Sequence, residues 1–187
     1  PTTCLVIPQP LEGDGSPEAL FAGWLEHHGR EDAWLSVAAR GAVRLAGLGY
    51  APPITGSDNP AAVADHAVPA AIPFGIRHAG RPVDAACAVR PYAEITNANE
   101  GVEAVGVMAA AIAVLVGGGD MDAAVAAARS ESRADGWLRD NLDSALAIVG
   151  GAASPFAAIT PLMRLLSART YSHGGIAPDT VPLALAV

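Results

Sequence analysis

The feature of this sequence that most constrains its fold is a long apolar segment, Val102 to Val116, whose only charged residue is Glu103. The segment is too short to cross a membrane, which takes about 20 residues, and its composition is typical of a buried helix. Hydrophobic residues make up 51% of the chain but aromatic residues only 5%, so the core must consist mainly of Ala, Val, Leu and Ile. Because small side chains let helices approach closely, these features predict a compact helical bundle.

Apolar residues in the rest of the chain recur at helical spacing, and no segment shows the period of two that is typical of a half-buried strand. We therefore expect an all-α fold, a multi-helix orthogonal or bundled array, with residues 1–187 as a single domain. Residues 56–60 are expected to form a loop. The expected helices cover residues 17–29 after an N-cap at Ser16, 31–46, 61–78 with interruptions near Pro69 and Pro73, 82 onward with a disturbance at Pro91, 99–116, 121–130 after a cap at Asp120, 135–149, 155–168 and 179–187.

The charged residues exclude several functions. The net charge is −8 and no basic face is visible, so we expect no nucleic-acid partner. The eleven residues counted as Lys or Arg are all arginines, and the absence of lysine excludes both a Schiff-base lysine and the lysine of a phosphate-binding P-loop. A chain rich in Ala, Gly and Arg but without lysine also suggests the GC-rich genome of a bacterium.

The cysteines and the start of the chain bear on location. Cys4 and Cys87 are the only cysteines and lack metal-binding spacing, so we interpret them as free thiols of a cytoplasmic protein; a disulfide between them is the alternative. The first residues show no charged segment followed by an apolar one, so we expect no signal peptide. We also expect no membrane partner, because no apolar segment is long enough to span one.

The main candidate functional residues gather in a polar region between apolar segments. Ser57, Asp58 and Asn59 are closely followed by Asp65 and His66. Because a histidine beside a carboxylate can act as a general base with an orienting partner, we expect Asp58, Asp65 and His66 to be catalytic. Ser57 and Asn59 are expected to contact the substrate. The alternative is structural, because Asp58 and Asn59 are ordinary turn residues and Asp65 would serve as a helix cap.

Two further residues are candidates for substrate binding. Glu100 lies at the start of the long apolar helix, where a carboxylate either interacts with the helix dipole or serves as an acid of the site. His173 lies in the loop Ser172-His173-Gly174-Gly175, where it is either functional or simply exposed.

From about Leu20 onward the order of several short motifs resembles the ADP-ribosylglycohydrolase family, which has an all-helical fold. Residues 65–75, Asp-His-Ala-Val-Pro-Ala-Ala-Ile-Pro-Phe-Gly, lie in the register of the family's Asn-Gly loop, its Met-Arg helix and its Pro-x-Gly step. Thr96-Asn97 occupies the place of a Thr-His pair before a long alanine-rich helix, which residues 103–116 match.

Near the end of the chain, residues 174–180 followed by Leu183-Ala184-Leu185 are similar to the family's Gly-Gly-Tyr-x-x-Asp-Thr motif, which begins a helix. The resemblance implies a multi-helix ADP-ribosylglycohydrolase-like array. It also implies that Thr96, Asn97 and Asp179 contact the substrate.

The sequence departs from this family at its metal-binding motifs. The family's Asp-Asp-Thr motif would fall near Thr2-Thr3, where the acids are absent, and its closing Asp-x-Asp-Thr motif would lie beyond Val187. Asp65-His66 replaces Asn-Gly, Pro69-Ala70 replaces Met-Arg, and Asn97 replaces the histidine. Because a two-metal site needs several fixed carboxylates, we expect no metal site and no cofactor. Magnesium would bind only with ligands supplied from elsewhere.

Three functions remain open. The first, which we favour, is a divergent enzyme that acts on a small molecule by metal-independent acid/base chemistry in the family's ancestral cleft. His66 would be the acid/base, oriented by Asp65 or Asp58. Asn97 or Glu100 would polarise the substrate, which is nucleoside-like or an intermediate of biosynthesis. The second is a catalytically inactive ligand-binding or partner module, whose exposed apolar faces favour a homo-oligomer such as a homodimer. The third is hydrolysis of the N-glycosidic bond of ADP-ribose, with metal ligands from another chain.

Overall fold

The structure of this protein, a computed structural model, describes residues 15–30, 33–166 and 175–187. Within these ranges the chain forms helices and no β-strand, which confirms the expectation of an all-α fold. None of the described helices is long and apolar enough to cross a membrane. The elements are α3 (Pro17–His28), α4 (Val37–Gly47), α5 (Ile54–Ser57), the 3₁₀ helix η1 (Asp65–Ala70), α6 (Ala71–Arg77), α7 (Pro82–Ala93), α8 (Glu100–Val116), α9 (Met121–Glu131), α10 (Trp137–Gly151), α11 (Pro155–Leu166) and α12 (Ala177–Ala186).

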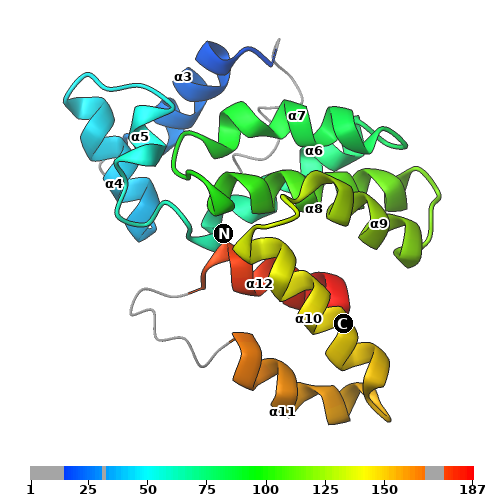
Figure 1. The fold of residues 1–187 in the computed structure, drawn as a ribbon. Coiled ribbons are helices and arrows are strands. Elements are labelled where there is room, and N and C mark those ends of the chain that lie inside the picture. Colours follow the sequence, from blue (N-terminus) through cyan, green and yellow to red (C-terminus); the bar gives the residue numbers. More distant parts are fainter. Residues whose placement is uncertain (1–14, 31–32, 167–174) are drawn as a thin grey trace.

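Helix α8 lies at the centre of the fold, as its apolar sequence predicts (Figure 1). It packs against α6, α7 and α9 and also contacts η1 and α12. Small side chains make these contacts close: Ala104 and Ala109 are fully buried. On α6, a Cβ atom at Gly75 would come within 2.6 Å of the Ile112 side chain of α8. The close approach of helices expected from the small residues of the sequence is therefore present.

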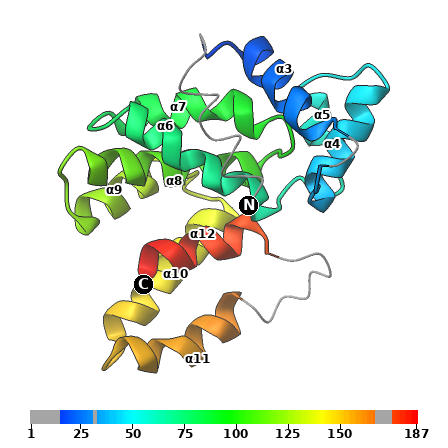
Figure 2. The same ribbon diagram turned by 180° about the vertical axis from the view of Figure 1, so that it is seen from behind.

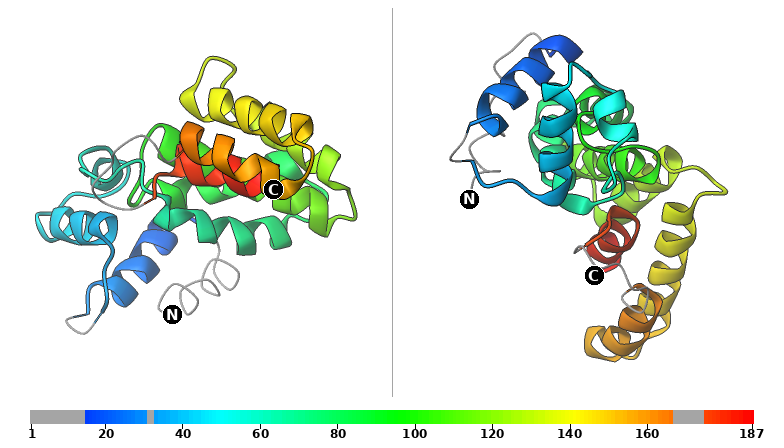
Figure 3. Two further views of the ribbon diagram at one scale, coloured as in Figure 1. Left: turned by 90° about the horizontal axis from the view of Figure 1, so that it is seen from below. Right: turned by 90° about the vertical axis from the view of Figure 1, so that its left-hand side faces the viewer.

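Two further groups of helices extend from this centre (Figure 2 and Figure 3). One group contains α3, α4 and α5, and its buried contacts include Trp24, Ala42 and Ile95. The other contains α10, α11 and α12, where Ala145 and Leu162 belong to a small apolar cluster.

Side-chain caps begin several helices where the sequence predicts them. The Ser16 hydroxyl accepts a hydrogen bond from Ala19 N (3.2 Å), and the Asp120 carboxylate accepts one from Ala123 N (2.8 Å). Each satisfies a backbone donor that the first helical turn leaves without a partner.

Other expected boundaries were wrong. The second helix begins at Val37 rather than near residue 31, because Ser36 is its N-cap and accepts a hydrogen bond from Ala39 N. The region expected to be a loop at residues 56–60 starts inside α5, which ends at Ser57. Residues 61–64 are not helical; the helical region begins with η1 and continues as α6. Helix α7 continues through Pro91 to Ala93, so the expected disturbance does not end it.

Candidate functional site

Three distant parts of the chain meet beside Asp65, at a place that we call the junction: residues 62–65, 96–101 and 175–180. Backbone hydrogen bonds connect the three parts. They are Ala98 N to Ala62 O (3.0 Å), Ala177 N to Val63 O (2.8 Å) and Asp65 N to Gly175 O (3.2 Å). Segment 62–65 is therefore held between the start of α8 and the start of α12, and these contacts account for its departure from the expected helix.

The side chain of Asn97 adds a further connection at the junction. It is buried, and its Nδ2 donates a hydrogen bond to Ala64 O at 2.7 Å. Its Oδ1 accepts a hydrogen bond from the buried Thr96 hydroxyl at 2.8 Å. Both residues, expected to bind substrate, thus have structural partners. Asn97 also borders the cleft described below.

Glycine residues allow the close approach of the backbone at the junction. A Cβ atom at Gly101 would collide with Ala62 O and would lie 2.6 Å from the Asn97 amide nitrogen. A Cβ atom at Gly56 would likewise overlap the backbone carbonyl of Asn97. No other residue type fits at these two positions without moving the backbone.

Asp65 lies half-buried at the junction, at the first position of η1. Its carboxylate contacts the backbone of Gly175 so closely that a Cβ atom there would collide with Oδ2. The Thr180 methyl group borders the same position. Within the described ranges no side chain or backbone group donates a hydrogen bond to the carboxylate, which leaves Asp65 with a polar group available for other contacts.

His66 has a different environment from Asp65. Its Nδ1 is buried and has no hydrogen-bond partner among the described residues. Burial, with a smaller contribution from nearby His28 of α3, lowers the pKa of His66 to about 4. Successive side chains of a 3₁₀ helix point about 120° apart, so Asp65 and His66 face different surroundings. No hydrogen bond joins them, and the expected pair of acid and histidine is not formed in this structure.

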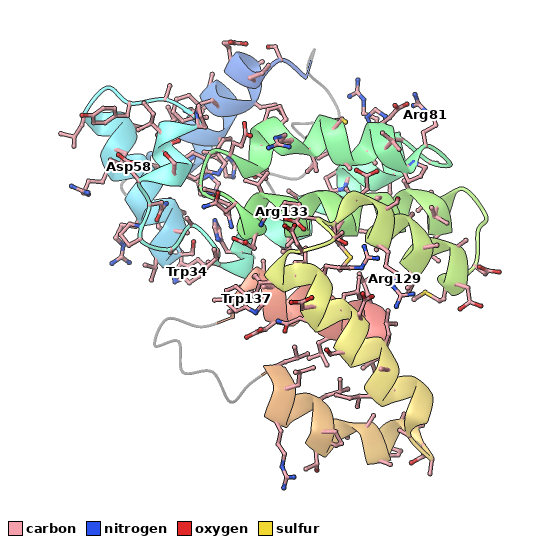
Figure 4. All side chains as sticks on the ribbon, viewed as in Figure 1. Trp34, Asp58, Arg81, Arg129, Arg133 and Trp137 are labelled. Carbon is pink, nitrogen blue, oxygen red and sulfur yellow. The ribbon has the colours of Figure 1, made fainter. Side chains whose placement is uncertain are left out.

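The remaining residues of the first polar cluster lie on α5 and after it. Asp58 is exposed, with the Ser57 hydroxyl 3.4 Å from its carboxylate (Figure 4). Asn59 is buried, donates from Nδ2 to Ala38 O at 2.7 Å and accepts from Ala61 N at 3.1 Å. Asn59 therefore ties this turn to α4. No described contact joins Ser57 or Asp58 to the junction.

Two of the other candidates have partners, and one cannot be placed. Asp179 is buried in the first turn of α12, where its Oδ1 accepts a hydrogen bond from Asn141 Nδ2 at 2.9 Å. Glu100 is half-buried and pairs with Arg133, with 2.6 Å between Oε1 and an Nη atom. His173 lies outside the described residues.

A cleft of about 460 Å³ adjoins the junction on the side of α7 and α9, and it is the only feature that we refer to below as the cleft. Its size lies within the range of about 300–1,000 Å³ that is usual for ligand pockets. It is lined by Ala86, Cys87, Arg90, Glu94, Asn97, Ala98, Asn99, Val102, Glu103, Gly106, Glu131 and Arg133. Cys87 is an exposed free thiol, as expected, whereas Cys4 lies outside the described residues.

Arg133 connects the end of α9 to the first turn of α8 at the edge of the cleft (Figure 4). Its Nε donates to Glu103 Oε2 at 2.9 Å, and its backbone N–H donates to Oε1 of the same residue at 2.8 Å. With the contact to Glu100, this makes three charge-assisted hydrogen bonds around one arginine. Hydrogen bonds to Glu103 raise the pKa of Arg133, which remains charged.

Most residues of the cleft were not predicted from the sequence. Arg90, Glu131 and Arg133 were not singled out, because each is isolated among apolar neighbours or lies in an ordinary polar turn, and Glu94 was given no role. Glu103 was noted only as the charge in an apolar segment. That charge was the available signal: a carboxylate in a buried helix requires a partner.

The carboxylates of the described residues do not fit the magnesium site that the resemblance implies. No group of three or more His, Cys, Asp or Glu side chains lies close enough within these residues to hold a metal ion. Asp65, Glu100 and Asp179 are the acids of the junction, but Glu100 pairs with Arg133 and Asp179 already accepts a hydrogen bond from Asn141. A two-metal site needs more oxygen ligands than these.

Comparison with known proteins identifies a family. The sequence model described as ADP-ribosylglycohydrolase matches residues 9–187, which is most of the chain. No curated protein and no solved structure matches significantly. The family model and the fold thus agree with the resemblance seen in the motifs.

Proposed function

Because the chain belongs to the ADP-ribosylglycohydrolase family, we propose that it is a divergent hydrolase-like enzyme that binds a small polar molecule in the cleft and acts on it by acid/base chemistry at the junction. The observation that carries this proposal is the carboxylate of Asp65. It is fixed in the junction by its backbone and by Gly175, and it has no hydrogen-bond donor among the described residues.

In this proposal Asp65 is the general acid or base, and the substrate extends to it from the cleft past Asn97, which borders both the cleft and the junction. A carboxylate held in a fixed position without a competing partner can exchange a proton with a substrate group or with a water molecule. Asn97 acts as a positioning residue, because its amide holds segment 62–65 against the start of α8. The neutral His66 serves as a second, less favoured candidate, since its Nδ1 is buried away from the Asp65 carboxylate.

The proposed reaction does not use a metal ion held by the described residues, because they do not supply a suitable ligand set. The hydrolysis of ADP-ribosyl N-glycosidic bonds with magnesium ligands from another chain would be a different function. It is separated from the proposal by its dependence on magnesium.

A second candidate function is ligand binding without turnover. It is favoured by the positions of the three residues that the sequence analysis interprets as catalytic. Asp58 is exposed beside α5, Asp65 contacts Gly175, and His66 is buried near His28. Because they do not converge, they do not form one acid/base group.

The homo-oligomer remains a proposal attached to this second candidate. Phe156, Ile159 and Met163 lie on one face of α11 and are exposed, with Phe156 at 84%. An exposed apolar face of this kind is common in interfaces between chains. Sedimentation equilibrium that shows a monomer at micromolar concentration would contradict it.

The experiment that tests the proposed function is a reaction screen followed by mass spectrometry and NMR. The purified protein is incubated with ADP-ribosylated peptide, nucleosides and small zwitterionic compounds, once with magnesium and once with a chelator. We expect turnover of at least one compound in the chelator, reduced by about a hundredfold in Asp65→Asn, in line with the usual contribution of a general acid or base. Asp122→Asn, an exposed acid of α9 outside the cleft, is the matched control.

The possible results separate the functions. Turnover that requires magnesium would contradict metal-independent chemistry and favour glycohydrolase activity with ligands from elsewhere. Binding of a compound without any turnover would favour the second candidate. Equal turnover by Asp65→Asn and the unaltered protein would remove Asp65 from the mechanism.

A further inference from the structure

Charges of opposite sign occupy different depths of the cleft. The two arginine side chains are the more exposed, with Arg90 at 69% and Arg133 at 55%. The carboxylates of Glu94 and Glu103 lie deeper, with 30% and 10% of their side chains exposed. A molecule that enters the cleft therefore meets guanidinium groups at the rim and carboxylates below them.

Glu131 is the carboxylate of the cleft that has no ion-pair partner among the described residues. It is the last residue of α9, where the helix dipole is negative. A carboxylate at this end of a helix is unfavourable on its own and favours a cation nearby. Arg129, its closest arginine in sequence on the same helix, is instead paired with Asp143 of α10. Glu131 therefore places a carboxylate without a described cation partner in the lining of the cleft.

The rim of the cleft has the opposite property. The guanidinium of Arg90 pairs with Glu94 through Nε, and that of Arg133 pairs with Glu103 through Nε and with Glu100 through one Nη atom. A guanidinium has five N–H donors, so each arginine keeps donors that these pairs do not use. A carboxylate accepts two of these donors side by side with favourable geometry.

Small residues form the wall of the cleft where α7 packs on α8. A Cβ atom at Gly106 would meet only Ala86, at the ordinary contact distance of 3.7 Å. Val102 completes an apolar surface along the same wall. A volume of about 460 Å³ is sufficient for a molecule of dipeptide size with an apolar side chain on this surface.

We propose that the cleft binds a small zwitterion, up to the size of a dipeptide, with its carboxylate at Arg90 and Arg133 and its ammonium group at Glu131. This inference rests on the proposed function, because it names the class of molecule that the same cleft accepts. The charges of the ligand and of the cleft are complementary at both ends, which gives orientation as well as affinity.

A matched set of three dipeptides tests the ligand class by isothermal titration calorimetry. The set is alanyl-leucine, its N-acetylated form and its C-terminal amide. We expect alanyl-leucine to bind and each blocked form to bind at least about tenfold more weakly, because each lacks one of the two charges. Equal binding of a blocked form would overturn the zwitterion, and an absence of binding by all three would overturn the site.

Variants locate the binding in the cleft. We expect Glu131→Gln to weaken alanyl-leucine about tenfold while leaving the affinity of the N-acetylated form unchanged, because only the ammonium contact is lost. Glu26→Gln, an exposed glutamate of α3 outside the cleft, is the matched control and should bind as the unaltered protein does. Equal affinity of Glu131→Gln and the control would overturn the placement of the ammonium group.

The thiol of Cys87 gives an independent readout of occupancy. Cys87 is exposed and lines the cleft, so a bound dipeptide should slow its alkylation, measured by peptide mapping. Unchanged alkylation at a saturating dipeptide concentration would place the ligand elsewhere. These measurements do not depend on turnover. Dipeptide binding without any reaction would overturn the proposed function but not the ligand class. Asp65-dependent turnover of another molecule, without dipeptide binding, would overturn the ligand class but not the proposed function.

Discussion

The buried histidine of η1 makes the stability of this protein depend on pH in a defined direction. Burial lowers the pKa of His66 from 6.5 to about 4, because the charged imidazole has lost its water and has gained no hydrogen-bond partner at Nδ1 among the described residues. Nearby His28 adds to this effect when it is protonated. The folded protein therefore holds His66 in its neutral form at neutral pH.

The sign of the effect follows from the two pKa values. Above pH 6.5 His66 is neutral in both the folded and the unfolded chain, so its ionisation does not change the free energy of unfolding. Between about pH 6.5 and about pH 4 the unfolded chain takes up a proton that the folded chain does not, and stability falls as the pH falls. The whole difference corresponds to about 3 kcal/mol, since one pKa unit is about 1.4 kcal/mol.

The measurement is urea unfolding followed by far-UV circular dichroism, at about pH 7 and about pH 4.5, for the unaltered protein and His66→Gln. Glutamine does not titrate, so the difference between the two proteins isolates His66 from the carboxylates that both contain. We expect the unaltered protein to lose about 2 kcal/mol more than His66→Gln over this range.

His27→Gln provides the control, because His27 lies beside His28 on α3 but is not the buried group. It should retain most of the pH dependence of the unaltered protein. Parallel stability curves for His66→Gln and the unaltered protein would refute the reasoning, because they would mean that His66 is solvated or has a partner in the folded state.

Three further predictions concern the junction and the core. Gly101→Ala should prevent folding or lower the free energy of unfolding by more than about 3 kcal/mol, because its Cβ atom would collide with Ala62 O. Gly150→Ala, which has open space around it in α10, should instead stabilise the helix by about 1 kcal/mol. Equal melting temperatures of the two variants would contradict this. Asn97→Ala should cost about 2–4 kcal/mol in urea unfolding, since it leaves Ala64 O and the Thr96 hydroxyl without their partners, and a loss below about 0.5 kcal/mol would show that water replaces the amide. Burial raises the pKa of Tyr92 to about 12, so an ultraviolet titration should show one of the three tyrosines still protonated near pH 11, and ionisation of all three near pH 10 in the folded protein would argue against its burial.

The parts of the fold that the sequence predicts are those determined by neighbouring residues. Ser16 and Asp120 cap the helices that follow them, and residues 102–116 form the buried central helix. In each case the signal extends over a few residues, and the backbone groups it satisfies are local. Fold class and most helix boundaries therefore followed from periodicity and capping.

The junction could not be predicted in the same way, because its contacts join residues that are far apart in the sequence. Segment 62–65 reads as part of a helix, but it pairs with Ala98 and Ala177 instead. Long-range backbone hydrogen bonds leave no periodic pattern in a short segment. The glycines at 56 and 101 were the available sign of a close backbone approach, although glycine also has many other uses.

The candidate site shows the limit of reasoning from adjacency. Asp65 and His66 are neighbours in the sequence, yet a 3₁₀ helix turns their side chains toward different surroundings. Arg133 and Glu103 are thirty residues apart and form an ion pair in the lining of the cleft, with 2.9 Å between Nε and Oε2. Whether two polar residues cooperate depends on the direction of each side chain, which the sequence alone does not specify.

The most direct test of the central claim is a calorimetric titration of ADP-ribose into the protein, once with magnesium and once with a chelator. In the proposed function the described residues act without a bound metal ion, so we expect no binding of ADP-ribose that depends on magnesium. ADP-ribose that binds only in the presence of magnesium would contradict it, and would mean that a metal site is completed by ligands beyond the described residues.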